Sequence, residues 1–452
     1  MPAKSMEDIV ALCKRRGFVF QGSEAYGGLK GTYDFGPLGI EMKKNIRNSW
    51  WRSLVYERDD IEGVECSHIS NSLVWKYSGH EATFGDMLVE CKKCHVRMRV
   101  DKMADPTKCD ECGCKDLTEP RMFMLMMKTN IGPVDDGSSF AYLRAETAQS
   151  TYLNFKNVVD STSRKLPFGI VQNGKVFRNE ITPRNFLFRL REFEQAEMQF
   201  FVVPGEDEKW FDYWKQFRTD WWVNQGIPRD MLRYLPHETM SHYAKAAEDI
   251  EYKFPWGFDE IEGLHNRQDF DLGSHTKNQD TFDIKAKVMK NTDSVTKFSY
   301  FDAETKKEFI PFIVETAMGV DRAFMALITQ AYTEETLDNG ETRIVLKLMP
   351  HIAPVKVAII PLKRNEPRIV EKAKELKNRL MATGIGRIMF EDTGNIGKGY
   401  RRHDEIGTPY CLTVDFETLD NDTVTIRDRD SMQQQRIPLA GIEGHIRGLF
   451  KE

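Results

Sequence analysis

The sequence predicts an α+β protein with a small zinc-ribbon-like insertion and a C-terminal α/β domain. Three observations lead to this expectation. Five of the eight cysteines fall within 24 residues, in a polar stretch over residues 90–117. Two strand-like segments, residues 168–178 and 191–203, flank a proline- and arginine-rich loop and indicate a long hairpin. Beyond residue 350, strand and helix patterns alternate, which is typical of a compact α/β domain.

Length and composition place the chain among ordinary globular proteins. Its 452 residues suggest about three domains, and 40% hydrophobic with 29% charged residues excludes a disordered or collagen-like chain. No apolar run approaches the roughly 20 residues of a membrane helix, so we expect no membrane partner. The N-terminal segment MPAKSMEDIVALCKRRG carries acidic residues where an export signal would be apolar, which favours a cytoplasmic protein. A net charge of -5 is not that of a protein that coats nucleic acid, so such a partner would meet a local basic patch.

Helical periodicity first appears over residues 39–57, after the break at Gly36-Pro37. The apolar stripe of this segment consists of Met42, Ile46, Trp50, Leu54 and Val55.

Further elements follow from apolar spacing. Residues 210–225 and 241–248 look helical, and an apolar strand over 309–314 leads into the helical segment GVDRAFMALITQAY. After the prolines at 350 and 354 we expect a strand over 356–362, a helix over 367–382, a strand over 387–392, a Gly-rich basic turn and a strand over 410–416.

The cysteine spacing predicts a metal site. Cys91 and Cys94 are separated by two residues, as are Cys109 and Cys112, and 14 residues lie between the pairs. Each pair can place two thiolates on one tight turn, and two facing turns complete a tetrahedron around Zn²⁺. Cys114 is an alternative to Cys112, and four unligated thiols are the competing interpretation. Four thiolates would saturate the ion, so we expect a structural role.

The hairpin predicts a nucleotide-binding face. Alternate strand residues share a face, so Arg178 and Glu180 lie together on the first strand. On the second strand the polar face consists of Arg191, Phe193, Gln195, Glu197 and Gln199. Arginine can fork onto phosphate oxygens, phenylalanine can cover a base, and glutamate can accept from an exocyclic amine. A solvated sheet face with scattered ion pairs is the alternative.

Three other segments are less specific. In FIVETAMGVDRAF, Glu315 lies on a predicted strand and Arg322 at the start of a predicted helix, where both could reach a site. An ordinary strand-turn-helix with a solvated arginine is the alternative. LRAETAQ contains Glu146, another candidate site carboxylate, and is equally unspecific alone. GNIGKGYRRHDEIGTP lacks the Ser or Thr that follows Lys in a P-loop, and its Tyr400, Arg401 and Arg402 suit RNA phosphates and bases, or a solvated turn.

Taken together, these segments resemble a known family. FRNE (177–180), a loop and FRLREFEQAE (188–197) are similar to motif 2 of class II aminoacyl-tRNA synthetases, and ETAMGVDR (315–322) is similar to the motif 3 variant of glycyl-tRNA synthetases. Further matches in chain order are YDFGPLG (33–39), VWKYSGH (74–80), YLRAETAQ (142–149), HYAKAAEDIEYKFPWGFDEIEG (242–263) and GYRRHDEIGTPYCLTVDFETLDNDTVTIRDRD (399–430). The resemblance spans nearly the whole chain and is to the dimeric, single-chain type.

The resemblance implies a class II synthetase fold, an antiparallel sheet flanked by helices, with an anticodon-binding domain at the C-terminus. The implied division is a first catalytic part with the dimerisation motif (1–89), the Cys-rich insertion (90–118), a second catalytic part with motifs 2 and 3 (119–349) and the anticodon-binding domain (350–452). The implied reaction joins glycine and ATP, with Mg²⁺, into glycyl-adenylate and then transfers glycine to the 3′ end of tRNA(Gly). The implied assembly is a homodimer formed through residues 36–57.

The resemblance also implies residue roles. Arg178, Arg322 and Glu180 are the implied catalytic residues, with Arg178 at the α-phosphate, Glu180 on the adenine amine, Phe193 on the ring, Arg189 and Arg322 at the distal phosphates, and Glu260 as a magnesium ligand. The implied ATP-binding set is Arg178, Asn179, Glu180, Phe188, Arg189, Leu190, Arg191, Glu192, Phe193, Glu260, Ile261, Gly319, Val320, Asp321 and Arg322. The implied glycine-binding set is Arg99, Glu146, Phe193, Glu194, Gln195, Ala196, Glu197, Glu315, Thr316, Ala317, Met318 and Gly319.

The acidic set also makes physical sense. Glycine offers only an ammonium, a carboxylate and two hydrogens, and Glu146, Glu197 and Glu315 can hold the ammonium. Excluding larger rivals is sterically easy, so no editing site is required. Thr316 and Ala317 stand where the family usually has Pro-Ser, so a serine hydroxyl is missing. Thr316 is the candidate to replace it, and a backbone group or a water molecule is the alternative. Ala145 stands where the family often has proline.

Two other functions compete with this interpretation. One is a threonyl, prolyl or histidyl synthetase, which the acidic pocket and ETAMGVDR disfavour. The other is a non-catalytic polymerase accessory subunit of similar fold. Such a protein would be free to lose the charged residues of the site, yet all four are present: Arg178, Glu180, Glu315 and Arg322.

Overall fold

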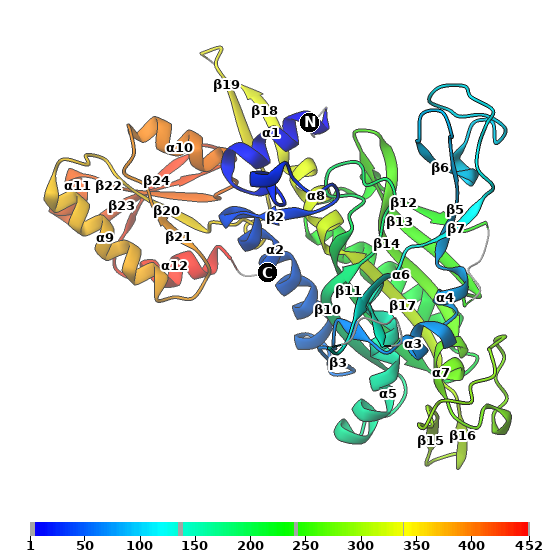
Figure 1. Ribbon diagram of the computed structural model, residues 1–452. Coiled ribbons are helices and arrows are strands. Elements are labelled where there is room, and N and C mark those ends of the chain that lie inside the picture. The colour runs from blue at the N-terminus through cyan, green and yellow to red at the C-terminus, as the bar shows by residue number, and fades with distance from the viewer. Residues whose placement is uncertain (1–4, 134–138, 239–242, 338, 451–452) are drawn as a thin grey trace.

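A seven-stranded sheet forms the centre of the larger part of the molecule (Figure 1). The computed structural model describes residues 5–133, 139–238, 243–337 and 339–450. The sheet order is β12-β13-β14-β17-β11-β10-β3, antiparallel throughout except for β3 beside β10. The strands are β3 Ile61–Gly63, β10 Phe168–Phe177, β11 Glu192–Val202, β12 Leu232–Pro236, β13 Ala246–Phe254, β14 Gly257–Gln268 and β17 Phe312–Gly319.

The predicted hairpin is confirmed as β10 and β11. Val171 pairs with Met198 and Phe177 with Glu192, so the two strands are in register along their length. The apolar alternation of β11 faces one side, where Met198 and Phe200 are fully buried. The polar alternation therefore faces the other side, as the strand period requires.

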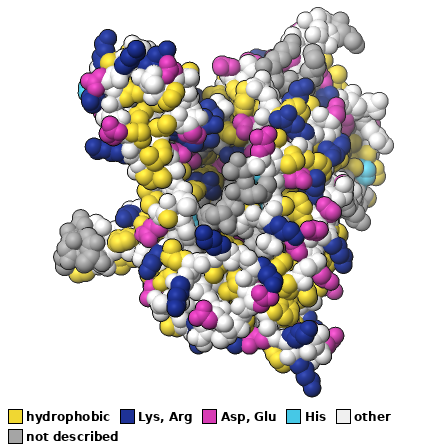
Figure 2. Space-filling view, turned by 90° about the vertical axis from the view of Figure 1, so that its right-hand side faces the viewer, with side chains coloured by type: hydrophobic (Ala, Val, Ile, Leu, Met, Phe, Trp, Pro, Cys, Tyr) yellow, Lys and Arg dark blue, Asp and Glu magenta, His cyan; other side chains and the backbone are white. Residues whose placement is uncertain are grey.

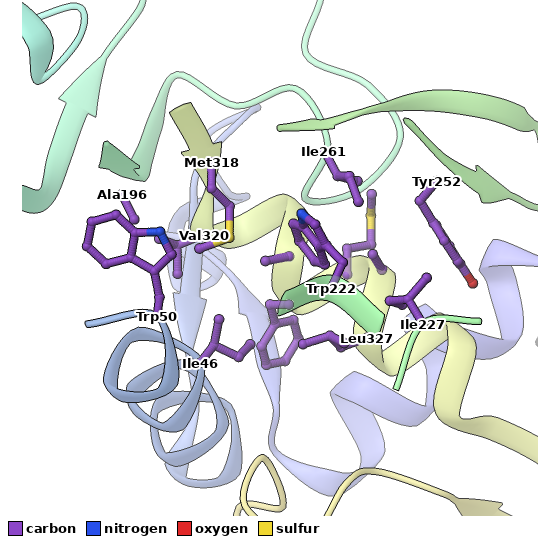
Figure 3. Close-up of a cluster of buried hydrophobic side chains, with 14 of the residues drawn as sticks. Ile46, Trp50, Ala196, Trp222, Ile227, Tyr252, Ile261, Met318, Val320 and Leu327 are labelled. Carbon is purple, nitrogen blue, oxygen red and sulfur yellow. The ribbon is translucent and has the colours of Figure 1, made fainter. Parts of the chain in front are cut away.

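Three helices cover the apolar face. They are α2 Pro37–Trp51, α6 Asp207–Asn224 and α8 Val320–Ala331. The predicted helices over 39–57, 210–225 and 319–332 are thus confirmed, with α2 continuing into one π-helical turn, Arg52–Tyr56. The predicted stripe residues Ile46 and Trp50 pack with Trp222 and Leu327 in the main core (Figure 3).

The opposite face of the sheet is only partly covered. α5 Ala148–Thr162 and α7 Phe270–His275 pack over one part of it, around Phe155, Phe168 and Phe201. The rest of this face, toward the hairpin loop, is left open as a cleft.

A small three-stranded sheet carries the cysteines and projects from the larger part of the molecule (Figure 1). Its strands are β5 Gly85–Glu90, β6 Arg97–Arg99 and β7 Arg121–Met124, with β5 in the middle. Shorter elements of the chain are α1 Met6–Arg16, β1 Val19–Gln21, β2 Tyr33–Phe35, β4 Ile69–Ser70, α3 Ser72–Tyr77, α4 His80–Thr83, β8 Met127–Asn130, β9 Phe140–Leu143, β15 Tyr300–Asp302, β16 Lys307–Phe309, β18 Tyr332–Thr336 and β19 Thr342–Leu346.

The C-terminal part is a separate α/β layer, as the alternating pattern predicts. Its sheet order is β21-β20-β22-β23-β24, parallel among the first three strands and antiparallel beyond β22. The elements are β20 Val357–Pro361, α9 Pro367–Met381, β21 Ile388–Phe390, α10 Ile396–Glu405, β22 Tyr410–Val414, α11 Phe416–Asn421, β23 Thr423–Asp428, β24 Gln434–Pro438 and α12 Ile442–Gly448.

Three element predictions are wrong. Residues 241–248 do not form a helix within their described part, because β13 begins at Ala246 and its alternating Ile250, Tyr252 and Phe254 bury one face in the sheet. The Gly-rich basic turn after residue 392 is α10, which the Asn395 side chain caps by accepting from the Lys398 amide at 2.9 Å.

The predicted strand over 309–314 is divided at Pro311. β16 ends at Phe309 and β17 begins at Phe312, because proline has no amide hydrogen to donate to a ladder. Among the described helices, none has the length and apolar composition needed to cross a bilayer.

Candidate active site

The open half of the sheet face is a cavity of about 290 Å³. The hairpin, its loop, β14, β17 and the start of α8 supply its walls. The predicted residues that line it are Glu146, Arg178, Glu180, Phe188, Arg189, Leu190, Phe193, Gln195, Glu197, Glu260, Glu315, Ala317, Gly319, Asp321 and Arg322. The structure therefore brings together residues that lie up to 176 positions apart, from 146 to 322.

Three carboxylates meet at one end of this cavity. Glu315 accepts from Gln199 Nε2 at 2.7 Å and from Arg267 Nη1 at 2.9 Å. Glu197 accepts from the Thr147 hydroxyl at 2.5 Å. Glu146 accepts from Gln149 Nε2 at 3.1 Å and lies 3.3 Å from His80 Nε2.

The environment moves the pKa values of these carboxyls in opposite directions. Burial, reinforced by the negative charges of Glu315 and Glu146, raises the pKa of Glu197 to about 8. Burial also disfavours the charged form of Glu315, but the Arg267 guanidinium outweighs it and lowers the pKa of Glu315 to about 2. His80 likewise outweighs burial and lowers the pKa of Glu146 below its ordinary value.

Arginine side chains occupy the other end. Arg178 Nε donates to the Ala145 carbonyl at 3.0 Å, and its guanidinium lies 5.2 Å from the centre of the Phe193 ring. Arg322 pairs with the Glu260 carboxylate at 2.9 Å and lies 4.1 Å from the centre of the Phe188 ring. The cavity thus has a cationic end beside aromatic rings and an anionic end.

Several predicted site residues have side chains that point elsewhere. Ala196, Ile261, Met318 and Val320 are fully buried in the main core on the far side of the sheet (Figure 3). Thr316 also faces away from the cleft, and its hydroxyl has no partner among the described residues. The idea that Thr316 replaces the absent serine hydroxyl is therefore wrong, because Glu315 and Ala317 occupy the cleft face of β17.

Charged residues around the hairpin also find other partners. Glu194 pairs with Lys43 at 3.1 Å and with Arg47 at 2.8 Å behind the sheet. Glu192 pairs with Lys175 at 3.0 Å, and Arg191 Nε donates to the Glu180 carbonyl at 3.0 Å. The last two predicted residues are Asn179, whose amide donates to the Leu125 carbonyl at 2.6 Å, and Arg99, which pairs with Asp86 at 3.1 Å and Asp101 at 2.8 Å.

The cleft also contains residues that the sequence did not single out. Arg267, His265 and Gly263 lie on the cleft face of β14, and Tyr243 lies 3.9 Å from the Arg267 guanidinium, measured to the ring centre. Arg267 is fully buried and holds Asp271 with two hydrogen bonds of 2.7 and 2.9 Å. The alternation Gly263, His265, Arg267 was the available signal, but it is visible only once β14 is known to border the cleft.

Four of the cysteines converge as predicted. The ligand atoms of Cys91, Cys94, Cys109 and Cys112 all lie within 4.8 Å of one another. Cys91 Sγ is 3.6 Å from Cys112 Sγ, and Cys94 Sγ is 3.6 Å from Cys109 Sγ. Tetrahedral thiolates at Zn–S distances of about 2.3 Å would be about 3.8 Å apart, so the cluster fits Zn²⁺. Cys114 lies outside the cluster.

Tyr400, Arg401 and Arg402 of α10 are engaged within the chain. The Tyr400 hydroxyl lies 2.6 Å from Thr413 Oγ1, and Arg427 lies over its ring at 4.7 Å. Arg402 pairs with Glu391 at 2.5 Å and Arg401 with Glu341 at 3.0 Å. Tyr400 is therefore held against the C-terminal sheet by contacts on its ring and on its hydroxyl.

Comparison with known proteins gives the family. Residues 129–332 match the family model described as tRNA synthetase class II core domain (G, H, P, S and T), and residues 356–449 match the anticodon binding domain. The prolyl-tRNA synthetase of Giardia lamblia, in complex with prolyl-adenylate, shares the fold at a TM-score of 0.64 and 17% identity, over 96% of this chain and 75% of that one.

The curated relatives are more specific. The chain is 50% identical to the glycine--tRNA ligases of Deinococcus radiodurans and Thermus thermophilus over the full length of both. It is 47% identical to that of Borrelia hermsii, over 98% of this chain and 97% of the relative. The chain belongs to the glycine--tRNA ligases, a family of class II aminoacyl-tRNA synthetases.

Proposed function

We propose that the cleft carries out glycine activation and transfer, with its acidic end for the amino acid and its cationic end for ATP. The observation that supports this division is the convergence of Glu146, Glu197 and Glu315 at one end and of Arg178 and Arg322 at the other.

The acidic end suits the glycine ammonium. Three carboxyl groups in a buried setting cannot all ionise without compensating partners nearby; Arg267 donates to Glu315, and His80 Nε2 lies 3.3 Å from Glu146. Among the residues that the structure describes, no cation lies within hydrogen-bonding distance of the third carboxyl, Glu197, so a substrate ammonium would complete the set. Ala317 and Gly319 add little bulk beside these carboxylates, consistent with a small substrate.

The cationic end suits the triphosphate. Arg178 would neutralise charge at the α-phosphate as a glycine carboxylate oxygen attacks phosphorus and the bond to the β-phosphate oxygen breaks, releasing pyrophosphate. Phe193 would stack on adenine, Glu180 would accept from its amine, and Arg322 would hold the distal phosphates. In the second step the 3′-hydroxyl of the tRNA attacks the glycyl carbonyl and the bond to AMP breaks.

Glu260 is the residue that would hold Mg²⁺. The ion would neutralise phosphate oxygens when bound with ATP. Glu260 borders the cleft and already accepts from Arg322, so a phosphate–metal unit would replace part of that ion pair.

Zn²⁺ is proposed for the four-cysteine cluster as a structural ion. Its thiolates would join the turns that follow β5 and precede β7, in a sheet too small for much apolar core. We also propose that the chain divides into four parts: the first catalytic part (1–89), the Cys-rich insertion (90–118), the second catalytic part (119–349) and the anticodon-binding domain (350–452).

tRNA(Gly) would contact both parts of the chain. Figure 2 shows lysine and arginine side chains interspersed with acidic ones over one face of the molecule. Because these charges are mixed, local patches rather than a bulk positive field would guide binding.

A cytoplasmic homodimer formed through residues 36–57 completes the proposal. Within this segment the large apolar side chains of Ile40 and Tyr56 are 39% and 74% exposed in a single chain, and a partner would cover them. Sedimentation at micromolar concentration should give twice the 52.4 kDa of one chain; a single-chain mass would contradict the dimer.

Amino-acid-dependent exchange of pyrophosphate into ATP tests the function. Purified protein should support exchange with glycine and not with alanine, serine, threonine or proline, and should then charge unfractionated tRNA with glycine. Arg178→Gln should abolish exchange, and Arg164→Gln, at a partly exposed pair with Glu62 outside the cleft, should not. Exchange with another amino acid, or none with glycine, would contradict the proposal.

A further inference from the structure

Thr147 makes an unusual contact for a residue that caps the start of a helix. It is the N-cap of α5, where a threonine hydroxyl normally accepts from a backbone amide, yet its side chain makes no capping bond. Its hydroxyl instead donates to Glu197 Oε2 at 2.5 Å, across the sheet face. Thr147 is fully buried and does not line the cleft.

The Thr147 backbone is held independently of this contact. Its carbonyl accepts from Gln172 Nε2 at 2.8 Å and from the Ser150 hydroxyl at 2.8 Å. The start of α5 therefore stays in place when the hydroxyl is removed, and the hydroxyl itself is free for another role.

Glu197 depends on this hydroxyl more than its neighbours depend on any single group. Glu315, from β17, has both Arg267 and Gln199, and Glu146, from the segment before α5, has both His80 and Gln149. Within the described ranges, Thr147 is the only residue that donates a hydrogen bond to the Glu197 side chain.

We propose that Thr147 is a positioning residue for glycine: its hydroxyl turns the Glu197 carboxyl toward the cleft and favours its ionised form, which the substrate ammonium requires. This inference rests on the proposed use of the acidic end for glycine.

The surroundings of Glu197 explain why one hydroxyl matters. Glu315 and Glu146 repel its negative charge, while the Arg267 guanidinium is the cation that favours it. Arg144 is buried nearby and its charge also interacts with Glu197. Burial and the two carboxylates prevail, so the pKa of Glu197 is raised to about 8, against the lowering effect of the Thr147 hydrogen bond.

The sign of the effect follows from linkage. Glycine must bind the ionised form, so below a pH of about 8 binding displaces a proton from Glu197. Without the hydroxyl the pKa rises further and the displacement costs more. Above both pKa values Glu197 is ionised with or without the hydroxyl, and the difference disappears.

The test compares Thr147→Val, which keeps shape and removes the hydroxyl, with Thr147→Ser, which keeps the hydroxyl. The glycine KM is measured by pyrophosphate exchange at saturating ATP between about pH 6.5 and about pH 9, a range that brackets the pKa of Glu197. At neutral pH, Thr147→Val should raise the glycine KM roughly tenfold, as expected for a lost hydrogen bond to a charged group. Its KM should approach the wild-type value toward high pH, and Thr147→Ser should restore the wild-type profile.

The matched control is Thr329→Val, because Thr329 is buried in α8 and its hydroxyl has no partner among the described residues. Its pH profile should equal that of the wild type. If Thr147→Val raises the glycine KM by the same factor at every pH, Thr147 has only a packing role. If the glycine KM of Thr147→Val is unchanged, Thr147 has no role in glycine binding. Either result would overturn the inference.

Glu197→Gln keeps the test decisive if Thr147→Val folds poorly. It should remove the inflection near the raised pKa from the glycine KM profile, and an inflection that persists would overturn the inference. Absence of glycine-dependent exchange in the wild type would instead mark failure of the proposed function itself.

Discussion

Replacing Glu315 with glutamine removes one negative charge from the acidic end while keeping the side-chain volume. In the native cleft its two oxygens accept from Gln199 Nε2 at 2.7 Å and from Arg267 Nη1 at 2.9 Å. A glutamine can accept with only one of its two polar groups, so its NH₂ must face one of these donors. Arg267 keeps its two bonds to Asp271, which limits the damage to the fold.

The magnitude follows from the contacts that are lost. A hydrogen bond that involves a charged group contributes about 1.5–3 kcal/mol. Losing one such contact to the glycine ammonium should lower kcat/KM for glycine by roughly 10- to 150-fold. Glu197 would then face one carboxylate fewer and ionise more easily, which places the expected loss near the lower bound. Glu315→Ala, which also leaves a void, should abolish exchange.

Steady-state pyrophosphate exchange measures this, with the glycine and ATP constants determined separately. The glycine constant should carry the defect while the KM for ATP stays within about twofold, since Glu315 lies at the end of the cleft away from Arg322. Glu308→Gln is the control, because Glu308 is a partly exposed carboxylate on β16 paired with Lys297 at 2.7 Å. Near-normal glycine kinetics in Glu315→Gln, or an equal defect for ATP, would refute the reasoning.

Three further outcomes are expected. Elemental analysis should find one zinc per chain; Cys112→Ser should lose it and Cys114→Ser retain it, and the reverse pattern would exchange their roles. Lys43→Met should lower the free energy of unfolding by about 3–5 kcal/mol in urea titrations, because it leaves the buried carboxylate of Asp321, 2.8 Å from the Lys43 ammonium, short of a cation; a loss below about 1 kcal/mol would contradict this. Burial lowers the pKa of His403 to about 4, so between about pH 6.5 and about pH 4 the folded state binds fewer protons than the unfolded one. The free energy of unfolding should therefore fall as the pH drops through this range, and the fall should be smaller in His403→Gln. An identical pH profile in the variant would contradict the lowered pKa of His403.

The hairpin is the part of the site that the sequence predicts best. Strand alternation alone divides β11 into a polar face and an apolar face, and the structure has Phe193, Gln195 and Glu197 in the cleft with Met198 in the core. A match to a motif covers every residue of a segment, whichever side of the sheet its side chain is on. The predicted glycine-binding set therefore includes Glu194 and Ala196, although strand alternation places their side chains behind the sheet.

Glu260 shows what alternation cannot predict. Regular pairing would turn it to the same side as Glu262, which lies in the core with Arg218. The register of β13 and β14 shifts between Ile250 and Glu251, so Glu251 pairs with Glu260 and one residue of β14 is skipped. This bulge turns Glu260 toward the cleft, and a bulge depends on both strands at once.

Arg267 was missed for a related reason. Its partners Asp271 and Glu315 come from α7 and β17, and only the sheet order, with β14 beside β17, brings them together. The order of strands in a sheet is set by tertiary packing rather than by local periodicity. The helix predicted over residues 241–248 failed similarly, because pairing with β14 outweighs the helical preference of its alanines.

A crystal structure with a non-hydrolysable glycyl-adenylate analogue tests the central claim most directly. The account predicts the ammonium within hydrogen-bonding distance of Glu197 and Glu315, the adenine against Phe193 and the phosphate-equivalent group beside Arg178. An analogue bound outside this cleft, or bound with its ammonium remote from both carboxylates, would contradict it.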